Sequence, residues 1–168
     1  MAAPLDLSPD LDATLERVLA LTAGAEVSWW IIGSAAMALH GALGLQIADV
    51  DLLMGPADAR RLTAALPRDP RDVAGGGAPE GADRPLFRSE VFGRLNDTPL
   101  PIDVMAGFHV RGVEVRPATR RAVALRRGPV FVPELPELIA ITRGFGRPKD
   151  LERVVVLEAL AAGPRPVA

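Results

Sequence analysis

Residues 26–54 read EVSWWIIGSAAMALHGALGLQIADVDLLM and contain two short apolar runs separated by small residues. The first run, 27–32, is almost wholly apolar and ends at Gly33, which is typical of a strand buried on both faces. The second, 49–54, alternates acidic and apolar residues and also predicts a strand. Helix-prone residues at 34–39 lie between them. The segment therefore predicts a strand, a short helix and a second strand.

Gly33 and Ser34 stand where the first predicted strand meets the short helix. Backbone N–H groups at a helix start lack intrahelical partners and attract anions, and glycine lets a phosphate approach closely. The serine hydroxyl adds a further donor. The pair is therefore a candidate phosphate site, although a simpler interpretation is that Ser34 only caps its helix.

Asp49 and Asp51 are the next candidate site. Side chains alternate along a strand, so the two carboxylates project to the same side. Carboxylates held so close repel each other unless a positive charge lies between them, and oxygen ligands on one face suit Mg2+. The apolar neighbours of these acids support this interpretation, because an uncompensated charge among them is costly. The alternative is a solvated strand edge.

Asp103 is an acid between Ile102 and Val104, in a run that otherwise predicts a buried strand. If that strand neighbours the one carrying Asp49 and Asp51, three carboxylates converge, which is enough to hold two Mg2+ ions about 4 Å apart. The alternative is an edge-strand aspartate in an ordinary α+β domain. That alternative requires the three acids to be well separated or fully solvated.

Turn residues and apolar periodicity organise the rest of the chain. A proline- and glycine-rich loop is expected over 67–85, and the Asn96–Pro99 turn predicts a hairpin. The remaining predicted elements are helices at about 9–23, 57–66, 134–143 and 148–162, and strands at 86–95, 100–105, 109–116 and 122–132.

Composition excludes several classes of chemistry. The chain has 168 residues, 19 basic and 21 acidic side chains, two histidines and no cysteine. Disulfides, cysteine-ligated metals, thiol nucleophiles and paired-histidine zinc sites are therefore excluded. A net charge of -2 gives no general attraction to nucleic acid. Because no membrane span or basic leader is evident, we expect one cytoplasmic domain over 1–168 with a helical pair at about 134–162.

These motifs occur in an order that resembles the nucleotidyltransferase superfamily of the DNA polymerase β type. The resemblance rests on Gly33-Ser34, on Asp49-x-Asp51 fifteen residues after Ser34, and on the hydrophobic-Asp-hydrophobic triplet 102–104. More narrowly, residues 33–53 together with Gly146-Arg147-Pro148-Lys149-Asp150-Leu151-Glu152 resemble small stand-alone bacterial members. Some of those belong to toxin–antitoxin or abortive-infection systems.

The resemblance implies an α+β fold, with a small mixed sheet and flanking helices, and a Mg2+-dependent transfer of a nucleoside monophosphate. In such a site Gly33 and Ser34 would grip a nucleoside triphosphate, with ATP the expected substrate. Asp49 and Asp51 would bind two Mg2+ ions, and Asp103 would complete the metal site. Lys149 would contact a phosphate, unless it is only an exposed residue in the first turn of the last helix.

The sequence departs from the family pattern at three positions. Relatives often carry Arg and Thr shortly before the Asp-x-Asp pair, where this chain has Leu45 and Ile47, and a Lys where it has Thr142. These departures leave open an alternative function, a catalytically decayed domain that acts as a binding or antitoxin-like module.

The acceptor hydroxyl is expected on a protein, an RNA or a small molecule. Residues 111–127 contain six arginines, which could follow the backbone of an RNA such as tRNA. The other interpretation is a solvated sheet edge that the charges protect from pairing with another chain.

Overall fold

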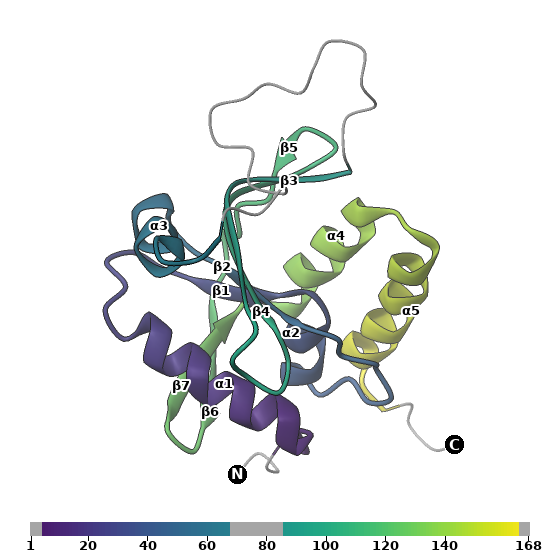
Figure 1. Ribbon diagram of the computed structural model, residues 1–168. Helices are drawn as coiled ribbons and strands as arrows, with labels where there is room; N and C mark the ends of the chain where they lie inside the picture. The colour runs from purple at the N-terminus through teal and green to yellow at the C-terminus, as the bar shows by residue number, and fades with distance from the viewer. Residues whose placement is uncertain (1–4, 68–85, 165–168) are drawn as a thin grey trace.

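The computed structural model describes residues 5–67 and 86–164 (Figure 1). The N-terminal half contains α1 (Pro9–Thr22), β1 (Trp30–Ile32), α2 (Gly33–Leu39), β2 (Val50–Leu53) and α3 (Pro56–Thr63). The second half contains β3 (Phe87–Leu95), β4 (Ile102–Val110), β5 (Val113–Glu114), β6 (Arg121–Leu125), β7 (Gly128–Val132), α4 (Leu135–Phe145) and α5 (Pro148–Ala162).

The main sheet is mixed, which confirms the α+β prediction. Its strand order is β1-β2-β4-β3, and β5 pairs with the far end of β4. Strand β2 runs parallel to β4, whereas β1–β2 and β3–β4 are antiparallel. Strands β6 and β7 form a separate antiparallel hairpin, and β7 contacts both β1 and α1. The order matters for function because it places β2 and β4 side by side.

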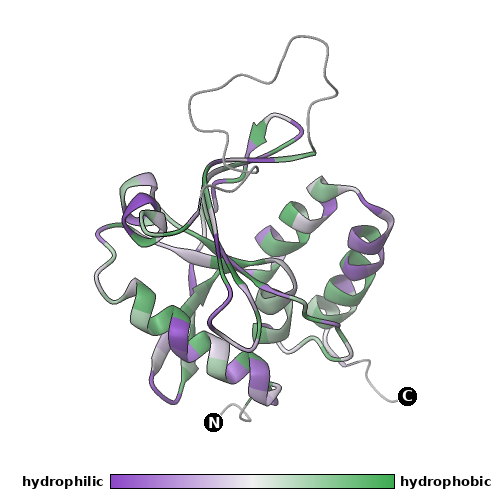
Figure 2. Ribbon diagram, in the orientation of Figure 1, coloured by the Kyte–Doolittle hydropathy of each residue, from purple (hydrophilic) through white to green (hydrophobic). Residues whose placement is uncertain are grey.

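The helices surround this sheet. In Figure 1, α4 and α5 lie together on one side and α3 lies on the other. Helix α1 begins where Ser8 caps it, since the Ser8 hydroxyl accepts a hydrogen bond from the backbone N–H of Leu11 at 3.2 Å. The short helix α2 packs against β1, β2 and α4. Hydrophobic residues follow the central strands, and α1 and α5 are mixed, as expected of helices with one buried face (Figure 2).

Two hydrophobic clusters form the core. The larger cluster joins α1, α2, the sheet and the inner faces of α4 and α5, and includes Leu15, Ile31, Leu52, Val104, Leu138 and Leu157. The smaller cluster lies on the other face of the central strands and consists of Ile32, Leu53, Phe92, Met105, Phe108, Val110 and Phe145. Strands β1, β2 and β4 contribute to both clusters, so they are buried on both faces.

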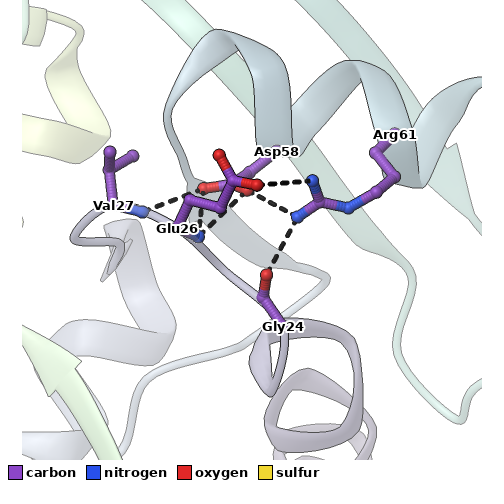
Figure 3. Close-up of polar contacts among 5 residues, drawn as sticks. All are labelled: Gly24, Glu26, Val27, Asp58 and Arg61. Atoms are coloured by element: carbon purple, nitrogen blue, oxygen red, sulfur yellow. Dashed lines mark hydrogen bonds and ion pairs between the residues drawn. The ribbon is translucent and has the colours of Figure 1, made fainter.

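A buried carboxylate fixes the segment that leads into β1. Asp58, in the first turn of α3, is 1% exposed. It accepts hydrogen bonds from the backbone N–H groups of Glu26 at 3.1 Å and Val27 at 3.2 Å, and from Arg61 at 2.6 Å (Figure 3). Arg61 also donates to the Gly24 carbonyl at 3.0 Å. Asp58 thereby anchors the approach to β1 and to the Gly33 turn that follows it.

Most predicted elements are present, with shifted ends, and two predictions are wrong. The strand expected over 109–116 is the end of β4, a turn at Arg111 and Gly112, and the short β5. The strand expected over 122–132 is the β6–β7 hairpin, which turns where Arg126 and Arg127 precede Gly128. Apart from Pro67, the loop expected over 67–85 lies outside the described residues. Within the described ranges, no helix has the length and apolar character to cross a membrane.

Candidate functional site

Three aspartates meet at the junction of β2 and β4. In the parallel pairing of these strands Asp51 lies opposite Asp103, and Asp49 immediately precedes β2. Neighbours in register share a face of the sheet, so the carboxylates project together. All three line a pocket of about 320 Å3, together with Gly33 and Ser34. The convergence expected from the sequence is therefore present, and the requirement of the ordinary-domain alternative is not met.

Arg94 is the residue that sequence analysis missed. It lies in β3, opposite Asp103 in the antiparallel register with β4. Its Nε donates to Asp103 Oδ1 at 2.7 Å and its Nη2 to Asp103 Oδ2 at 2.8 Å. The same Nη2 contacts Asp49 Oδ2 at 3.2 Å. The sequence suggested that only metal ions would balance these acids; instead, a guanidinium of the chain supplies a positive charge. The sequence did offer a signal for this contact. It was an arginine nine positions before Asp103, on the other side of the predicted hairpin turn.

The electrostatics of the cluster remain unbalanced, because the charges of Arg94 and Arg147 do not offset burial and the two neighbouring acids at Asp51. Burial, followed by the charges of Asp49 and Asp103, raises the pKa of Asp51 to about 7. The hydrogen bonds to Asp103 raise the pKa of Arg94 above its ordinary value, so this side chain remains charged. The pocket thus has an acidic end that favours an additional cation.

Gly33 brings the backbone against the acidic cluster. Its φ is +70°, and a Cβ atom at this position would lie 2.5 Å from Asp51 Oδ2. A side chain is excluded there both by the backbone conformation and by the contact. Ser34 is buried and lies inside the first turn of α2, whose N-cap is Ile32. The interpretation that Ser34 only caps the helix is therefore wrong.

Three basic side chains also line the pocket. Arg147, Lys149 and Arg153 line it from the start of α5. Asp150 is fully buried and pairs with Arg147 at 2.5 Å, so that arginine is held in place. Lys149 is exposed in the first turn of α5 and also lines the pocket, and its contact with a phosphate remains a prediction.

Aromatic side chains line the same pocket as the acidic and basic residues. Phe87, Phe92, Phe108 and Phe145 line the pocket. The rings of Phe87 and Phe145 meet edge to face with their centroids 5.5 Å apart, and the Arg147 guanidinium lies over Phe87 at 4.7 Å. A ligand in this pocket would meet carboxylates, guanidinium groups and apolar rings together.

The three departures from the family pattern have structural roles. Leu45 and Ile47 pack against the larger hydrophobic cluster. Thr142 is fully buried in α4, and its hydroxyl donates to the Leu138 carbonyl at 2.7 Å. None of the three lines the pocket.

Several arginines of 111–127 have partners within the chain. The Arg120 guanidinium lies 3.4 Å from the centroid of the Phe131 ring. Arg126 and Arg127 both pair with Glu16 on α1, and Arg116 pairs with Glu114. These contacts assign several of the charges to packing and ion pairing within the chain.

The comparisons with known proteins bear on the fold. A crystal structure of a putative nucleotidyltransferase from Thermotoga maritima superposes with a TM-score of 0.59 over 84% of this chain and 88% of that one. The chain has a nucleotidyltransferase fold. Sequence identity in the superposition is 17%, so the likeness concerns the fold alone. No protein-family model matches the sequence, and no curated protein is significantly similar to it.

A nucleotidyltransferase fold raises the question of divalent metals. Three carboxylates on one face are the hard oxygen donors that Mg2+ prefers. However, among residues 5–67 and 86–164 no group of three or more His, Cys, Asp or Glu side chains is arranged to hold a metal ion. Arg94 engages both oxygens of Asp103 and one of Asp49, so these two carboxylates already have a cationic partner. The donor chemistry of the three carboxylates fits Mg2+.

Proposed function

We propose that this protein is a Mg2+-dependent nucleotidyltransferase that transfers a nucleoside monophosphate from a nucleoside triphosphate to a hydroxyl acceptor. The observation that carries the proposal is the convergence of Asp49, Asp51 and Asp103 beside Gly33, in one pocket that basic side chains also line. Nucleotidyl transfer needs mainly positioning and the neutralisation of charge on phosphate oxygens. A pocket with acids for cations and cations for phosphates meets both needs.

In the proposed reaction the acceptor oxygen forms a bond to the α-phosphorus of the triphosphate. The bond from that phosphorus to the β-phosphate bridging oxygen breaks, pyrophosphate leaves, and the hydroxyl proton passes to solvent. Mg2+, when bound by Asp49, Asp51 and Asp103, supplies positive charge that lowers the pKa of the acceptor hydroxyl and steadies the leaving group.

The other residues of the pocket would bind and orient the substrate. The Gly33 backbone permits close approach of a phosphate because no Cβ intervenes. Ser34 would donate a hydrogen bond to the triphosphate, and Lys149 would contact a phosphate from the exposed start of α5. The aromatic lining offers apolar surface to the nucleoside, with ATP the expected donor.

The physiological setting extends the same proposal. Residues 33–53 and 146–152 resemble small stand-alone bacterial members, some of which belong to toxin–antitoxin or abortive-infection systems. We infer a protein, an RNA such as tRNA, or a small molecule as acceptor, and a cytoplasmic location for the reaction.

One observation favours a second candidate function, a decayed nucleotidyltransferase-fold module that acts by binding. Arg94 already pairs with two of the three acids, which is one way in which a lost metal site could be compensated. Such a module would retain its partner after Asp49→Ala and Asp51→Ala.

Thermal unfolding with each nucleoside triphosphate and Mg2+ or Ca2+ tests the proposed function. We expect the melting temperature to rise by about 5 °C at saturating nucleotide and metal, because ligands that bind only the folded state stabilise it. Asp51→Asn is expected to abolish the rise. Asp97→Asn changes an exposed acid that does not line the pocket and should preserve it. No shift with any nucleotide and metal would contradict the proposal.

The acceptor is found by transfer of label. Purified protein is incubated with each α-32P-labelled nucleoside triphosphate, Mg2+, and either cell RNA or protein lysate. Label that becomes acid-insoluble with the wild type but not with Asp51→Asn identifies the acceptor class. Label that appears equally with both proteins would show that the cluster is not responsible.

A further inference from the structure

Arg94 occupies the carboxylates to which the proposed function assigns metal binding. Its Nε and Nη2 bond the two oxygens of Asp103 at 2.7 and 2.8 Å, and Nη2 also contacts Asp49 at 3.2 Å. The Asp103 side chain is 8% exposed and the Arg94 side chain 32% exposed, so this bidentate pair is shielded from solvent mainly on the aspartate side. Charge-assisted bidentate pairs are stronger and more directional than ordinary hydrogen bonds.

The strand register places Arg94 directly beside these acids. Arg94 and Asp103 are direct partners in the β3–β4 ladder, and Asp103 is in turn the partner of Asp51 on β2. Three adjacent strands thus present an arginine, an aspartate and an aspartate in one row across the sheet. Cross-strand neighbours of this kind lie within about 5.5 Å of each other at their Cβ atoms.

We propose that Arg94 is a positioning residue that competes with a divalent cation for the carboxylates of Asp49 and Asp103, so that metal binds fully only when the guanidinium leaves them. This inference rests on the proposed function. Mg2+ requires oxygen ligands at about 2.1 Å in octahedral geometry, and the lone pairs it needs are those that accept the Arg94 hydrogen bonds. The two cations also repel each other in a partly buried site.

A consequence is coupling between metal and nucleotide. The displaced guanidinium remains in the pocket, where the phosphates of a nucleotide are alternative acceptors for its N–H groups. Binding of metal alone must therefore break the ion pairs that Arg94 makes with Asp103 and Asp49. When metal binds together with a nucleotide, the phosphates give Arg94 new partners. By linkage, nucleotide should tighten metal binding and metal should tighten nucleotide binding by the same factor.

Mn2+ titration of the protein without nucleotide tests the competition, with binding followed by calorimetry or by the EPR signal of free Mn2+. We expect Arg94→Gln to bind Mn2+ about tenfold more tightly than the wild type, because the competing charge and its hydrogen bonds are gone. The matched control is Arg88→Gln, which removes an exposed pocket-lining arginine of the same strand and should change affinity by about twofold at most.

A second measurement on the wild type covers the case in which Arg94→Gln fails to fold. The Nε–H resonance of Arg94 is identified in a 15N-labelled sample as the signal that Arg94→Lys lacks. We expect it to be protected from exchange in metal-free protein, since it is bonded to Asp103, and to shift and lose protection on addition of Mg2+ with a nucleoside triphosphate.

The outcomes separate this inference from the function on which it rests. Equal Mn2+ affinity for wild type and Arg94→Gln, or an Arg94 signal that stays protected when metal and nucleotide bind, would overturn the competition and leave the metal site in place. Equal tightening by Arg94→Gln and Arg88→Gln would also overturn it, because a general charge effect would then suffice. Failure of both proteins to bind Mn2+, with and without nucleotide, would overturn the proposed metal site and this inference together.

Discussion

Single side chains set the charge of the pocket. Asp49, Asp51 and Asp103 bring three carboxylates together, and Arg94 offsets part of that charge. Burial and the neighbouring acids raise the pKa of Asp51 to about 7, because its negative charge is poorly compensated in this pocket. Perturbed carboxylates in a pocket are typical of functional sites, although ion-pair networks perturb pKa values as well.

Gly33 provides a test at the residue scale. Gly33→Ala adds a Cβ atom that would lie 2.5 Å from Asp51 Oδ2, at a φ of +70°. Gly44→Ala is the matched control, because Gly44 has a φ of +73° with nothing within 4 Å of the added atom. We expect Gly44→Ala to lower the free energy of unfolding by about 1 kcal/mol through backbone strain alone, and Gly33→Ala by at least about twice as much. Urea denaturation measures both, and equal losses would contradict the contact with Asp51.

At the scale of elements, carboxylates tie helices to the segments beside them. Asp58 joins α3 to the approach to β1, and Glu137 in α4 accepts hydrogen bonds from the backbone N–H groups of Ala118 and Thr119 before β6. Burial alone would raise the pKa of Asp58, but the hydrogen bonds from Glu26, Val27 and Arg61 outweigh it and lower the pKa. The ionised form of Asp58 is therefore favoured by folding.

This predicts a pH dependence of stability. Because the folded-state pKa of Asp58 lies below its unfolded value, its contribution is complete above the unfolded pKa of about 3.9 and is lost as the pH falls through the folded value. We expect Asp58→Asn to lower the free energy of unfolding by about 2 kcal/mol at pH 7, and the gap to the wild type to narrow below about pH 4. Urea denaturation at pH 7, 5 and 3 measures the gap. Asp97→Asn is the exposed control, and a gap for Asp58→Asn that stays constant with pH would contradict the prediction.

At the scale of the whole molecule, the smaller hydrophobic cluster links the folding stability of the protein to the geometry of the pocket. Phe145, at the end of α4, is 7% exposed and packs against Phe87 and Phe108, and all three rings line the pocket. The aromatic cluster thus attaches the α4–α5 pair, with its basic residues, to the sheet that carries the acids. The distance between these basic residues and the acids of the sheet depends on that packing.

Phe145→Ala tests this coupling. Removing a buried ring is expected to cost about 3 kcal/mol of unfolding free energy, and nucleotide-dependent stabilisation should fall as the basic residues of α5 lose their support. Val155, in α5, is 66% exposed. Val155→Ala should therefore change the free energy of unfolding by less than about 0.5 kcal/mol. Denaturation with and without nucleotide and Mg2+ measures both effects. A destabilised Phe145→Ala protein with an unchanged ligand response would show that the basic residues and the acids are positioned independently.

Local pattern was sufficient for much of the fold and for the acidic half of the site. Apolar periodicity predicted α1, α4 and α5, and the turn at Asn96–Pro99 predicted the β3–β4 hairpin. The spacing of Asp49 and Asp51 predicted a shared face, and the apolar triplet around Asp103 predicted a buried strand. That this strand pairs with β2 was the condition on which the expected convergence depended. It was less successful over 109–132, because two short hairpins joined by tight turns have the same apolar alternation as longer strands.

The sequence by itself determined which residues are acidic, apolar or glycine, and so which strands must be buried and which acids require compensation. The tertiary structure alone decided what compensates them. The pairing of β2 with β4 and of β4 with β3 sets Asp51, Asp103 and Arg94 in one row. Helix α5 brings Lys149 to the same pocket. Local periodicity specifies the face of a strand, but only the packed sheet specifies its neighbours, because register is set by the burial of the whole face and not by any one residue.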